Sequence, residues 1–239
     1  MRIADEKKRM VSAIIVAAGK GTRMGAGVDK LFLSVNGMPV VAHTWKKFDA
    51  AQCVDEIVLV IREDRKDAFR DLAREQAFRK PFRLVAGGNE RQDSVWYGLQ
   101  ALDGKSGIVA IQDAARPCTD SGLIEATVEA ARRMGAAVAA QAITDTIKES
   151  RDGRLIERTL DRSRLWAVQT PQTFRIDVIR RALAEVRNRG LVVTDDTAAC
   201  ELIGQPVELV VSNAPNPKVT RPEDVGYVEM VLRNAGRKG

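Results

Sequence analysis

The sequence predicts an α/β fold with a mainly parallel sheet and helices on both of its faces. Apolar runs of strand length alternate along the chain with amphipathic segments of helical period, an alternation typical of such sheets. Parallel strands are covered on both faces, so they are expected to be apolar throughout, as these runs are. The chain has 239 residues, 45% of them hydrophobic, which suits one large domain with a buried core.

The alternation is regular up to residue 142. A proline at position 39 suits the first turn of a helix, and Val95, Leu99 and Leu102 share one face of another. In chain order we predict a strand at 10–17, a helix at 39–50, a strand at 56–61, a helix at 64–76, a strand at 83–86, a helix at 90–102, a strand at 108–112, a helix at 121–134 and a strand at 136–142.

The regular alternation breaks at residues 145–162. Segments 146–150 and 154–158 flank Arg151-Asp152-Gly153, and alternating polarity around an Asp-Gly turn predicts a β-hairpin. A two-stranded hairpin is marginal by itself, so it needs a domain of its own or a partner subunit to lie on. We expect a flexible tail at 1–9 and a single domain at 10–239 that carries this hairpin as an arm.

Four further elements are predicted after the arm. They are a strand at 165–168, helices near 176–189 and 195–203, a strand at 207–211 and a final helix from Arg221.

The composition excludes several classes of protein. The formal net charge of +6 could indicate nucleic-acid binding, but the 38 cations are interleaved with 32 acids. Aromatic residues, at 5%, supply few surfaces for stacking bases, so we expect no nucleic-acid partner. No apolar run is long enough to cross a bilayer, and the charged start of the chain lacks the apolar core of a secretory signal. We therefore expect no membrane partner.

The cysteines and the single histidine carry no predicted chemistry. Cys53, Cys118 and Cys200 are far apart in sequence, which argues against a disulfide framework or a zinc cluster and favours a cytoplasmic location. His43 lies on the helix predicted at 39–50, and we expect a structural role for it rather than that of a general base.

The first apolar run leads into a glycine-rich turn, in the sequence IIVAAGKGTRMG at 14–25. Successive N–H groups in such a turn form a concavity that binds anions, and Arg23 and Lys30 add charge that suits a polyphosphate. The spacing does not fit the GxxxxGK[ST] loop. Its glycines fall as GxGxxxG rather than GxGxxG, so a structural turn and an atypical dinucleotide loop remain alternatives.

Three other segments could contribute to a site. Asp113 follows the strand at 108–112, where a carboxylate can hold Mg²⁺; a helix cap or an ion pair with Arg116 is the alternative. Gly87 and Gly88 precede a helix that carries Ser94. This glycine segment could offer backbone amides to a ligand, and a plain turn with a helix cap is the alternative. Lys218 lies in a proline-rich loop, which taken alone could be a linker.

Taken together, these motifs resemble those of the 2-C-methyl-D-erythritol 4-phosphate cytidylyltransferase family of the non-mevalonate isoprenoid pathway. The resemblance runs from about Met10 to Met230 and is specific because the pieces occur in order. They are AAGKGTRMG with Lys30, GGNERQDSV, DAARP, the TDT at 144–146, the LDR at 160–162, QTPQ at 169–172, TDD at 194–196 and PKVTRPED.

The resemblance implies a Rossmann-like fold, a homodimer, and transfer of a cytidylyl group from CTP to a sugar-alcohol phosphate with Mg²⁺ as cofactor. The acceptor phosphate attacks the α-phosphorus in line, and no general base is needed because the nucleophile is already an anion. Arg23 and Lys30 are implied as the catalytic cations. CTP binding is implied for Ala17, Ala18, Gly19, Gly21, Gly88, Ser94, Asp113 and Lys218, metal binding for Asp113, and acceptor binding for Arg116, Asp145, Thr146, Arg162 and Thr170.

The chain also departs from the family pattern. Asn89 stands where the family usually has Asp, which puts one base contact in doubt, and Asp29 and Leu31 flank Lys30 in place of the frequent Pro and Gln. Ribitol-5-phosphate cytidylyltransferase shares the glycine loop and is the alternative acceptor specificity, although Thr146 and Arg162 favour methylerythritol phosphate. A dinucleotide-dependent oxidoreductase would need an acid at the end of its second strand, and Glu63 keeps that alternative open.

Overall fold

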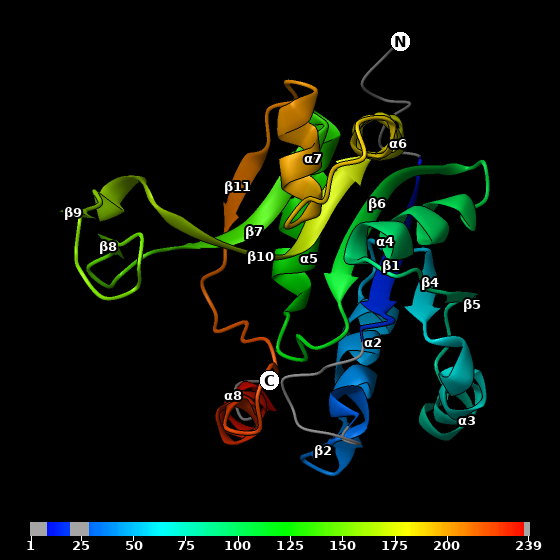
Figure 1. The fold of residues 1–239 in the computed structure, drawn as a ribbon. Helices are drawn as coiled ribbons and strands as arrows, with labels where there is room; N and C mark the ends of the chain where they lie inside the picture. The colour runs from blue at the N-terminus through cyan, green and yellow to red at the C-terminus, as the bar shows by residue number, and fades with distance from the viewer. Residues whose placement is uncertain (1–8, 20–28, 237–239) are drawn as a thin grey trace.

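The structure is a computed structural model that describes residues 9–19 and 29–236. Among these residues, seven strands form the central sheet (Figure 1). Of them, β10 alone runs antiparallel to its neighbours, so the prediction of a mainly parallel sheet is confirmed. The spatial order is β11 (Glu208–Val211), β7 (Ala136–Ala142), β10 (Trp166–Arg175), β6 (Ser106–Asp113), β1 (Met10–Ala17), β4 (Glu56–Ile61) and β5 (Phe82–Ala86).

Helices cover both faces of the sheet and bury two apolar cores. One core is formed with α2 (Val40–Ala50), α3 (Lys66–Gln76), α5 (Ser121–Met134) and α8 (Asp224–Gly236). The other is formed with α4 (Arg91–Gln100), α6 (Ile176–Asn188) and α7 (Asp196–Leu202). Successive residues of β1 enter opposite cores, Ile14 the second and Ile15 the first, because side chains alternate across a strand.

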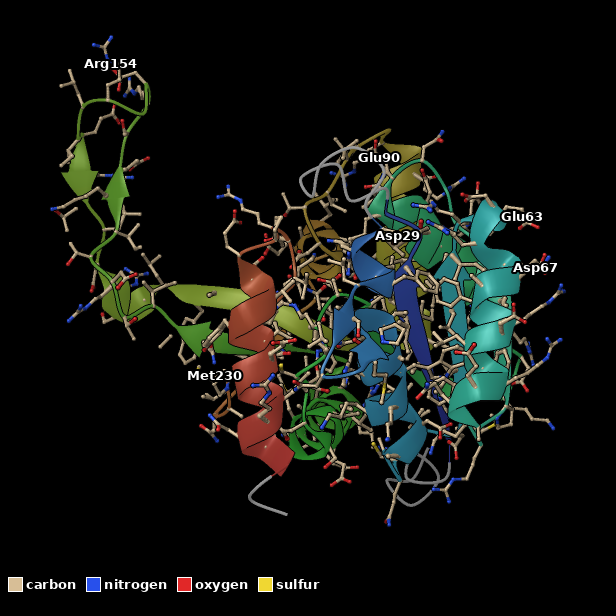
Figure 2. All side chains as sticks on the ribbon, turned by 90° about the horizontal axis from the view of Figure 1, so that it is seen from below. Asp29, Glu63, Asp67, Glu90, Arg154 and Met230 are labelled. Atoms are coloured by element: carbon tan, nitrogen blue, oxygen red, sulfur yellow. The ribbon has the colours of Figure 1, made fainter. Side chains whose placement is uncertain are left out.

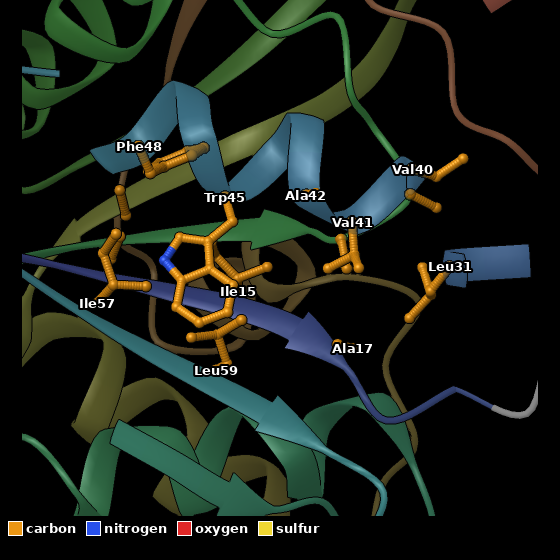
Figure 3. Packing of buried hydrophobic residues seen from close by; sticks show 14 of the residues in the cluster. Ile15, Ala17, Leu31, Val40, Val41, Ala42, Trp45, Phe48, Ile57 and Leu59 are labelled. Atoms are coloured by element: carbon orange, nitrogen blue, oxygen red, sulfur yellow. The ribbon is translucent and has the colours of Figure 1, made fainter. Parts of the chain in front are cut away.

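The packing of α2 shows how one face of the sheet is covered. Trp45 lies over Ile15, Ile57 and Leu59, with Phe48 beside it, and all five side chains are fully buried (Figure 3). An aromatic side chain buries 150–250 Å² or so, so these two rings contribute much of the apolar burial on this face. The helix fixes the position of the carboxyl end of β1, from which the candidate site is built.

Most predicted elements are present, several with the predicted bounds. The strands at 10–17, 56–61 and 136–142 and the helix at 121–134 agree with the structure at both ends. Short elements were not predicted: η2 (Lys30–Phe32), the hairpin of β2 (Ser34–Val35) with β3 (Met38–Pro39), η3 (Glu63–Arg65) and η4 (Arg162–Arg164).

The prediction of a strand limited to 165–168 is wrong in its extent. The strand β10 continues to Arg175 and pairs with β6 and β7, although its register with β7 shifts between Val168 and Gln172. Pro171 lies within this shift, preceded by a cis peptide bond. A proline in a strand usually argues against a central position because it removes a hydrogen-bond donor. Here the irregular register accommodates it.

The arm is present, but its predicted strands are wrong in extent. Only β8 (Lys148–Glu149) pairs with β9 (Arg158–Thr159), so residues 150–157 form a loop rather than a tight turn at 151–153. Asp152 Oδ1 accepts hydrogen bonds from the backbone N–H groups of Arg154, at 2.8 Å, and Leu155, at 2.9 Å, which bends the chain away from the ladder. The arm projects far from the central sheet, with Arg154 at its tip (Figures 1 and 2).

Other expectations concern the chain as a whole. The predicted tail at 1–9 lies outside the described residues except for Arg9. In the described part of the chain, every helix is too short or too polar to cross a membrane. Cys53, Cys118 and Cys200 are free thiols, and His43 Nε2 lies 2.7 Å from the carbonyl oxygen of Val35, in keeping with the expected structural role.

Candidate active site

A cavity of about 430 Å³ opens where β1 and β6 end. Ligands of open α/β sheets bind outside the carboxyl ends of the strands, so the position is the expected one. The turn before α4 and the segment before α8 complete its walls. Eight of the residues predicted for the site line this cavity: Ala17, Ala18, Gly19, Lys30, Gly88, Ser94, Asp113 and Lys218.

Asp113 is the last residue of β6, and three cations surround its carboxylate. Lys218 Nζ lies 2.8 Å and Arg116 Nε 3.6 Å from Oδ2, while Arg91 Nε lies 3.5 Å from Oδ1. The backbone N–H of Asp113 donates to Thr170 Oγ1 at 3.1 Å. Burial alone would raise the pKa of Asp113, but the three charges outweigh it and lower the pKa from 3.8 to about 2. The group is therefore ionised at neutral pH.

Arg91 links this cluster to a second, deeper carboxylate that the sequence analysis did not single out. Its Nη1 atom lies 2.8 Å from Oδ2 of Asp196, which is fully buried at the start of α7. Burial opposes the charge on Arg91, but Asp196 and Asp113 raise the guanidinium pKa. Arg91 lies in the motif GGNERQDSV and Asp196 in the motif TDD. The family motifs could therefore have pointed to both residues, although neither was assigned a role.

The turn before α4 needs glycine for reasons of space. A Cβ on Gly87 would lie 2.2 Å from Cβ of Ala18, and one on Gly88 would lie 2.3 Å from Cβ of Asp93. The backbone N–H of Gly88 donates to Ser94 Oγ at 3.1 Å, and Glu90 caps the helix reciprocally with Asp93. Ser94 is buried and holds the turn in place, so a structural role is established for it whether or not it meets a ligand.

The proline-rich segment before α8 is held against the site and is not a free linker. The backbone N–H of Val219 donates to the carbonyl of Ala115 at 2.8 Å, and Lys30 Nζ donates to the carbonyl of Val219 at 3.0 Å. Buried Asn216 donates to the carbonyl of Thr170 at 2.8 Å and accepts from Thr119 Oγ1 at 2.9 Å. These bonds place the Lys218 amine beside Asp113.

Of the other predicted site residues, the five that the structure describes do not line the cavity. Arg116 and Thr170 lie behind Asp113 and hold its carboxylate and its backbone. Asp145, Thr146 and Arg162 lie exposed on the arm, where Arg162 Nη1 donates to the carbonyl of Thr144 at 2.6 Å. Gly21 and Arg23 lie outside the described residues, so their predicted roles stay predictions.

The donor set of the cavity fits Mg²⁺ in one particular way. Within residues 9–19 and 29–236, no cluster of three or more acidic, histidine or cysteine side chains could enclose a metal. Mg²⁺ commonly takes one or two carboxylates and completes its coordination with water and substrate phosphates. Asp113 is ionised and lies at the cavity wall, so it fits this open mode of metal binding. The described residues do not form a closed cage of protein ligands.

The fold and the cavity define a nucleotide-binding α/β enzyme with a cationic site at the carboxyl edge of its sheet. The family model described as "IspD: 2-C-methyl-D-erythritol 4-phosphate cytidylyltransferase" matches residues 11–234. The chain belongs to this family, as the sequence motifs indicated, and it is a nucleotidyltransferase with the expected Rossmann-like fold.

Named relatives agree with the family assignment. The 2-C-methyl-D-erythritol 4-phosphate cytidylyltransferase of Pelotomaculum thermopropionicum is 43% identical over 225 residues, covering 93% of this chain and 94% of the relative. The enzyme of that name from Bacillus velezensis is 42% identical over 221 residues, 92% of this chain and 94% of the relative. The structure of 4-diphosphocytidyl-2C-methyl-D-erythritol synthase from Anaerococcus prevotii matches with a TM-score of 0.85 at 30% identity, covering 97% of this chain and 98% of that one.

Proposed function

We propose that the protein transfers a cytidylyl group from CTP to 2-C-methyl-D-erythritol 4-phosphate and releases pyrophosphate, as a step of isoprenoid biosynthesis. The observation that carries the proposal is the meeting of Lys30, Lys218 and Asp113 around one cavity in a chain of this family. The cations suit a triphosphate, and the glycines predicted to form the turn after β1 would let the backbone come close to a ligand.

The proposed mechanism uses position and charge rather than proton transfer. The acceptor phosphate is an anion that attacks the α-phosphorus in line, so the site needs no general base. Lys30 and Lys218 would hold the triphosphate and stabilise negative charge that develops in the transition state, together with Arg23. His43 is turned away into a bond with Val35, and burial lowers its pKa, which suits the structural role expected of it.

Asp113 is the residue that would hold Mg²⁺. When bound, Mg²⁺ neutralises and orients the triphosphate. The low pKa of Asp113 keeps the carboxylate available over the whole neutral range. Thr170 and Arg116 contribute by fixing this residue, the first at its backbone N–H and the second at Oδ2.

The arm is proposed to complete the acceptor site of a second subunit in a homodimer. Asp145, Thr146 and Arg162 are exposed on a projecting segment and take no part in the cavity of their own chain. A guanidinium suits a phosphate monoester, and a threonine hydroxyl suits the polar groups of the acceptor. The proposed setting of the enzyme is the cytoplasm, on the sequence argument alone.

Pyrophosphate release from a matrix of nucleotides and acceptors tests the proposal. We expect turnover with CTP, methylerythritol phosphate and Mg²⁺ together, and loss of turnover when any one is left out or when EDTA is added. Ribitol 5-phosphate is the matched control acceptor because it carries the same phosphate on a different polyol. Faster turnover of ribitol 5-phosphate would overturn the acceptor assignment.

A further inference from the structure

Asp29 precedes Lys30 and makes contacts on both sides of a short turn. Its Oδ1 atom accepts a hydrogen bond from the backbone N–H of Leu31 at 3.2 Å, which caps η2. Its Oδ2 atom lies 3.2 Å from Arg62 Nη2 and 3.0 Å from Arg65 Nε, two ion pairs made by one oxygen. The Asp29 side chain is only 12% exposed, whereas those of Arg62 and Arg65 are 23% and 38% exposed, so the carboxylate is shielded from solvent more than its two partners are.

The two arginines belong to a different part of the sheet edge. Arg62 directly follows β4, and Arg65 ends η3, so Asp29 connects the turn that carries Lys30 to the next strand of the sheet. In Figure 2, Asp29, Glu63 and Glu90 lie toward the same end of the molecule. Arg65 also lies over the ring of Phe32 at 5.6 Å, and Phe32 packs edge-on against Phe69. The turn is therefore held by ion pairs and by aromatic packing.

Lys30 lies between these anchors. Leu31, its neighbour, is buried in the apolar core, at 4% exposed. With Asp29 bound on one side and Leu31 buried on the other, the backbone of Lys30 has little freedom. Its side chain consequently leaves the turn in one direction, toward the cavity, where Nζ donates to the carbonyl of Val219.

We propose that Asp29 is a positioning residue for Lys30: its carboxylate, ion-paired with Arg62 and Arg65, fixes the turn that directs the Lys30 amine into the cavity. The inference rests on the proposed function, in which Lys30 meets the triphosphate. Placing a catalytic group in advance matters because a displacement of about 1 Å can cost on the order of a hundredfold in rate. Asp29 itself does not line the cavity, so it acts through Lys30.

A double-mutant cycle separates action through Lys30 from any other role. We expect Asp29→Ala to lower kcat by about tenfold or more in the wild-type background, with the KM for CTP changed less. Lys30→Ala should lower kcat by about a hundredfold. In the Lys30→Ala background, adding Asp29→Ala should change kcat less than about twofold, because the group that Asp29 positions is gone. An equal tenfold loss in both backgrounds, or no loss in either, would overturn the proposal.

Two further variants control for folding and for charge. Asp29→Asn keeps an oxygen that can cap Leu31 but removes the charge that pairs with the arginines, and we expect a loss between wild type and Asp29→Ala. Asp64→Asn is the matched control, since Asp64 also pairs with Arg62, at 3.2 Å, but is 70% exposed and does not touch the turn. It should leave kcat unchanged. A loss with Asp64→Asn equal to that with Asp29→Asn would overturn the proposal.

A readout that does not need turnover keeps this inference distinct from the proposed function. The rate at which an amine-acylating reagent labels Lys30, measured by mass spectrometry relative to Lys66, reports how firmly the side chain is held. We expect Asp29→Asn to raise the relative labelling of Lys30 several-fold. If wild type turned over neither acceptor, the proposed function would fail while this measurement still decided the role of Asp29. Unchanged labelling would overturn the positioning role.

Discussion

At the scale of single residues, the charge of Asp113 organises the site. Three cations lie within 3.6 Å of its carboxylate, so one buried anion lets Lys218, Arg91 and Arg116 approach one another. Removing a single charge from such a cluster leaves the rest uncompensated, which is costly when the groups are buried. The arrangement stabilises the folded protein and also gathers positive charge beside the cavity.

The low pKa of Asp113 predicts how stability depends on pH. Because its pKa is about 2 in the folded protein against 3.8 normally, the group stabilises the fold above about pH 4, and this contribution is lost as pH falls toward 2. At roughly 1.4 kcal/mol per pKa unit, the contribution is about 2 kcal/mol. Urea unfolding of wild type and Asp113→Asn should therefore differ more at pH 7 than at pH 3. A difference independent of pH would contradict this.

Arg91 and Asp196 show what sequence reasoning could not reach at this scale. Arg91 lies in the helix predicted at 90–102 and Asp196 in the one predicted near 195–203, and the sequence analysis assigned a role to neither residue. Only the packing of α7 against the sheet buries Asp196 completely and leaves Arg91 to neutralise it while contacting Asp113. Asp113 and Lys218, in contrast, could be predicted. Asp113 follows a predicted strand at the edge of the sheet where ligands bind, and Lys218 lies in the family motif PKVTRPED.

At the scale of elements, the turn between β5 and α4 supports the end of β1. Gly87 contacts Ala18, and Ser94 on the first turns of α4 holds the N–H of Gly88. The cavity wall is thus formed by two backbones in close contact, which leaves no room for a side chain between them. Any added atom must move one of the two segments.

We predict that Gly87→Ala lowers both stability and affinity for CTP. The new Cβ would lie 2.2 Å from Cβ of Ala18 and 2.9 Å from Ser94 Oγ, so it must push β1 and α4 apart. Such overpacking costs about 1–3 kcal/mol. Gly104→Ala is the control, because a Cβ there meets nothing within 4 Å. Thermal unfolding and CTP titration of both variants test this, and equal behaviour would show that the turn gives way without effect.

Element prediction succeeded where periodicity alone determines structure. The strand at 56–61 and the helix at 121–134 have uninterrupted patterns, and the structure matches both. It failed where a local signal is overridden. The strand predicted at 165–168 ends before Pro171, yet β10 continues through that residue. The Asp-Gly pair at 152–153 predicts a tight turn, yet Asp152 accepts hydrogen bonds from Arg154 and Leu155 instead.

At the scale of the whole molecule, the arm is the segment least explained by the chain on its own. It projects from the central sheet, and its two strands pair over two residues each (Figure 1). Leu155 and Ile156 are 73% and 66% exposed near its tip. A short hairpin is marginal without a surface to lie on, which is the physical reason for placing it against a second subunit.

The dimer proposal predicts that two damaged subunits restore one another. Arg162→Ala removes an acceptor contact and Lys30→Ala a catalytic cation, so each homodimer should be nearly inactive. If the arm completes the partner's site, a mixed dimer has one site with both lesions and one with neither. Activity should then return toward a quarter of wild type at equal mixing, because about half of the dimers are mixed and each has one intact site of two.

The control for this experiment is a mixture of Lys30→Ala with Asp113→Asn, two changes in the same cavity of one chain. In a mixed dimer of these variants each site keeps one lesion, so no activity should return. Subunit exchange must be shown independently, by mass spectrometry of differently tagged chains. Recovery with Arg162→Ala and none with Asp113→Asn would support a shared site. No recovery in either mixture, despite proven exchange, would mean that each site is built from one chain and that Arg162 is a solvated arm residue.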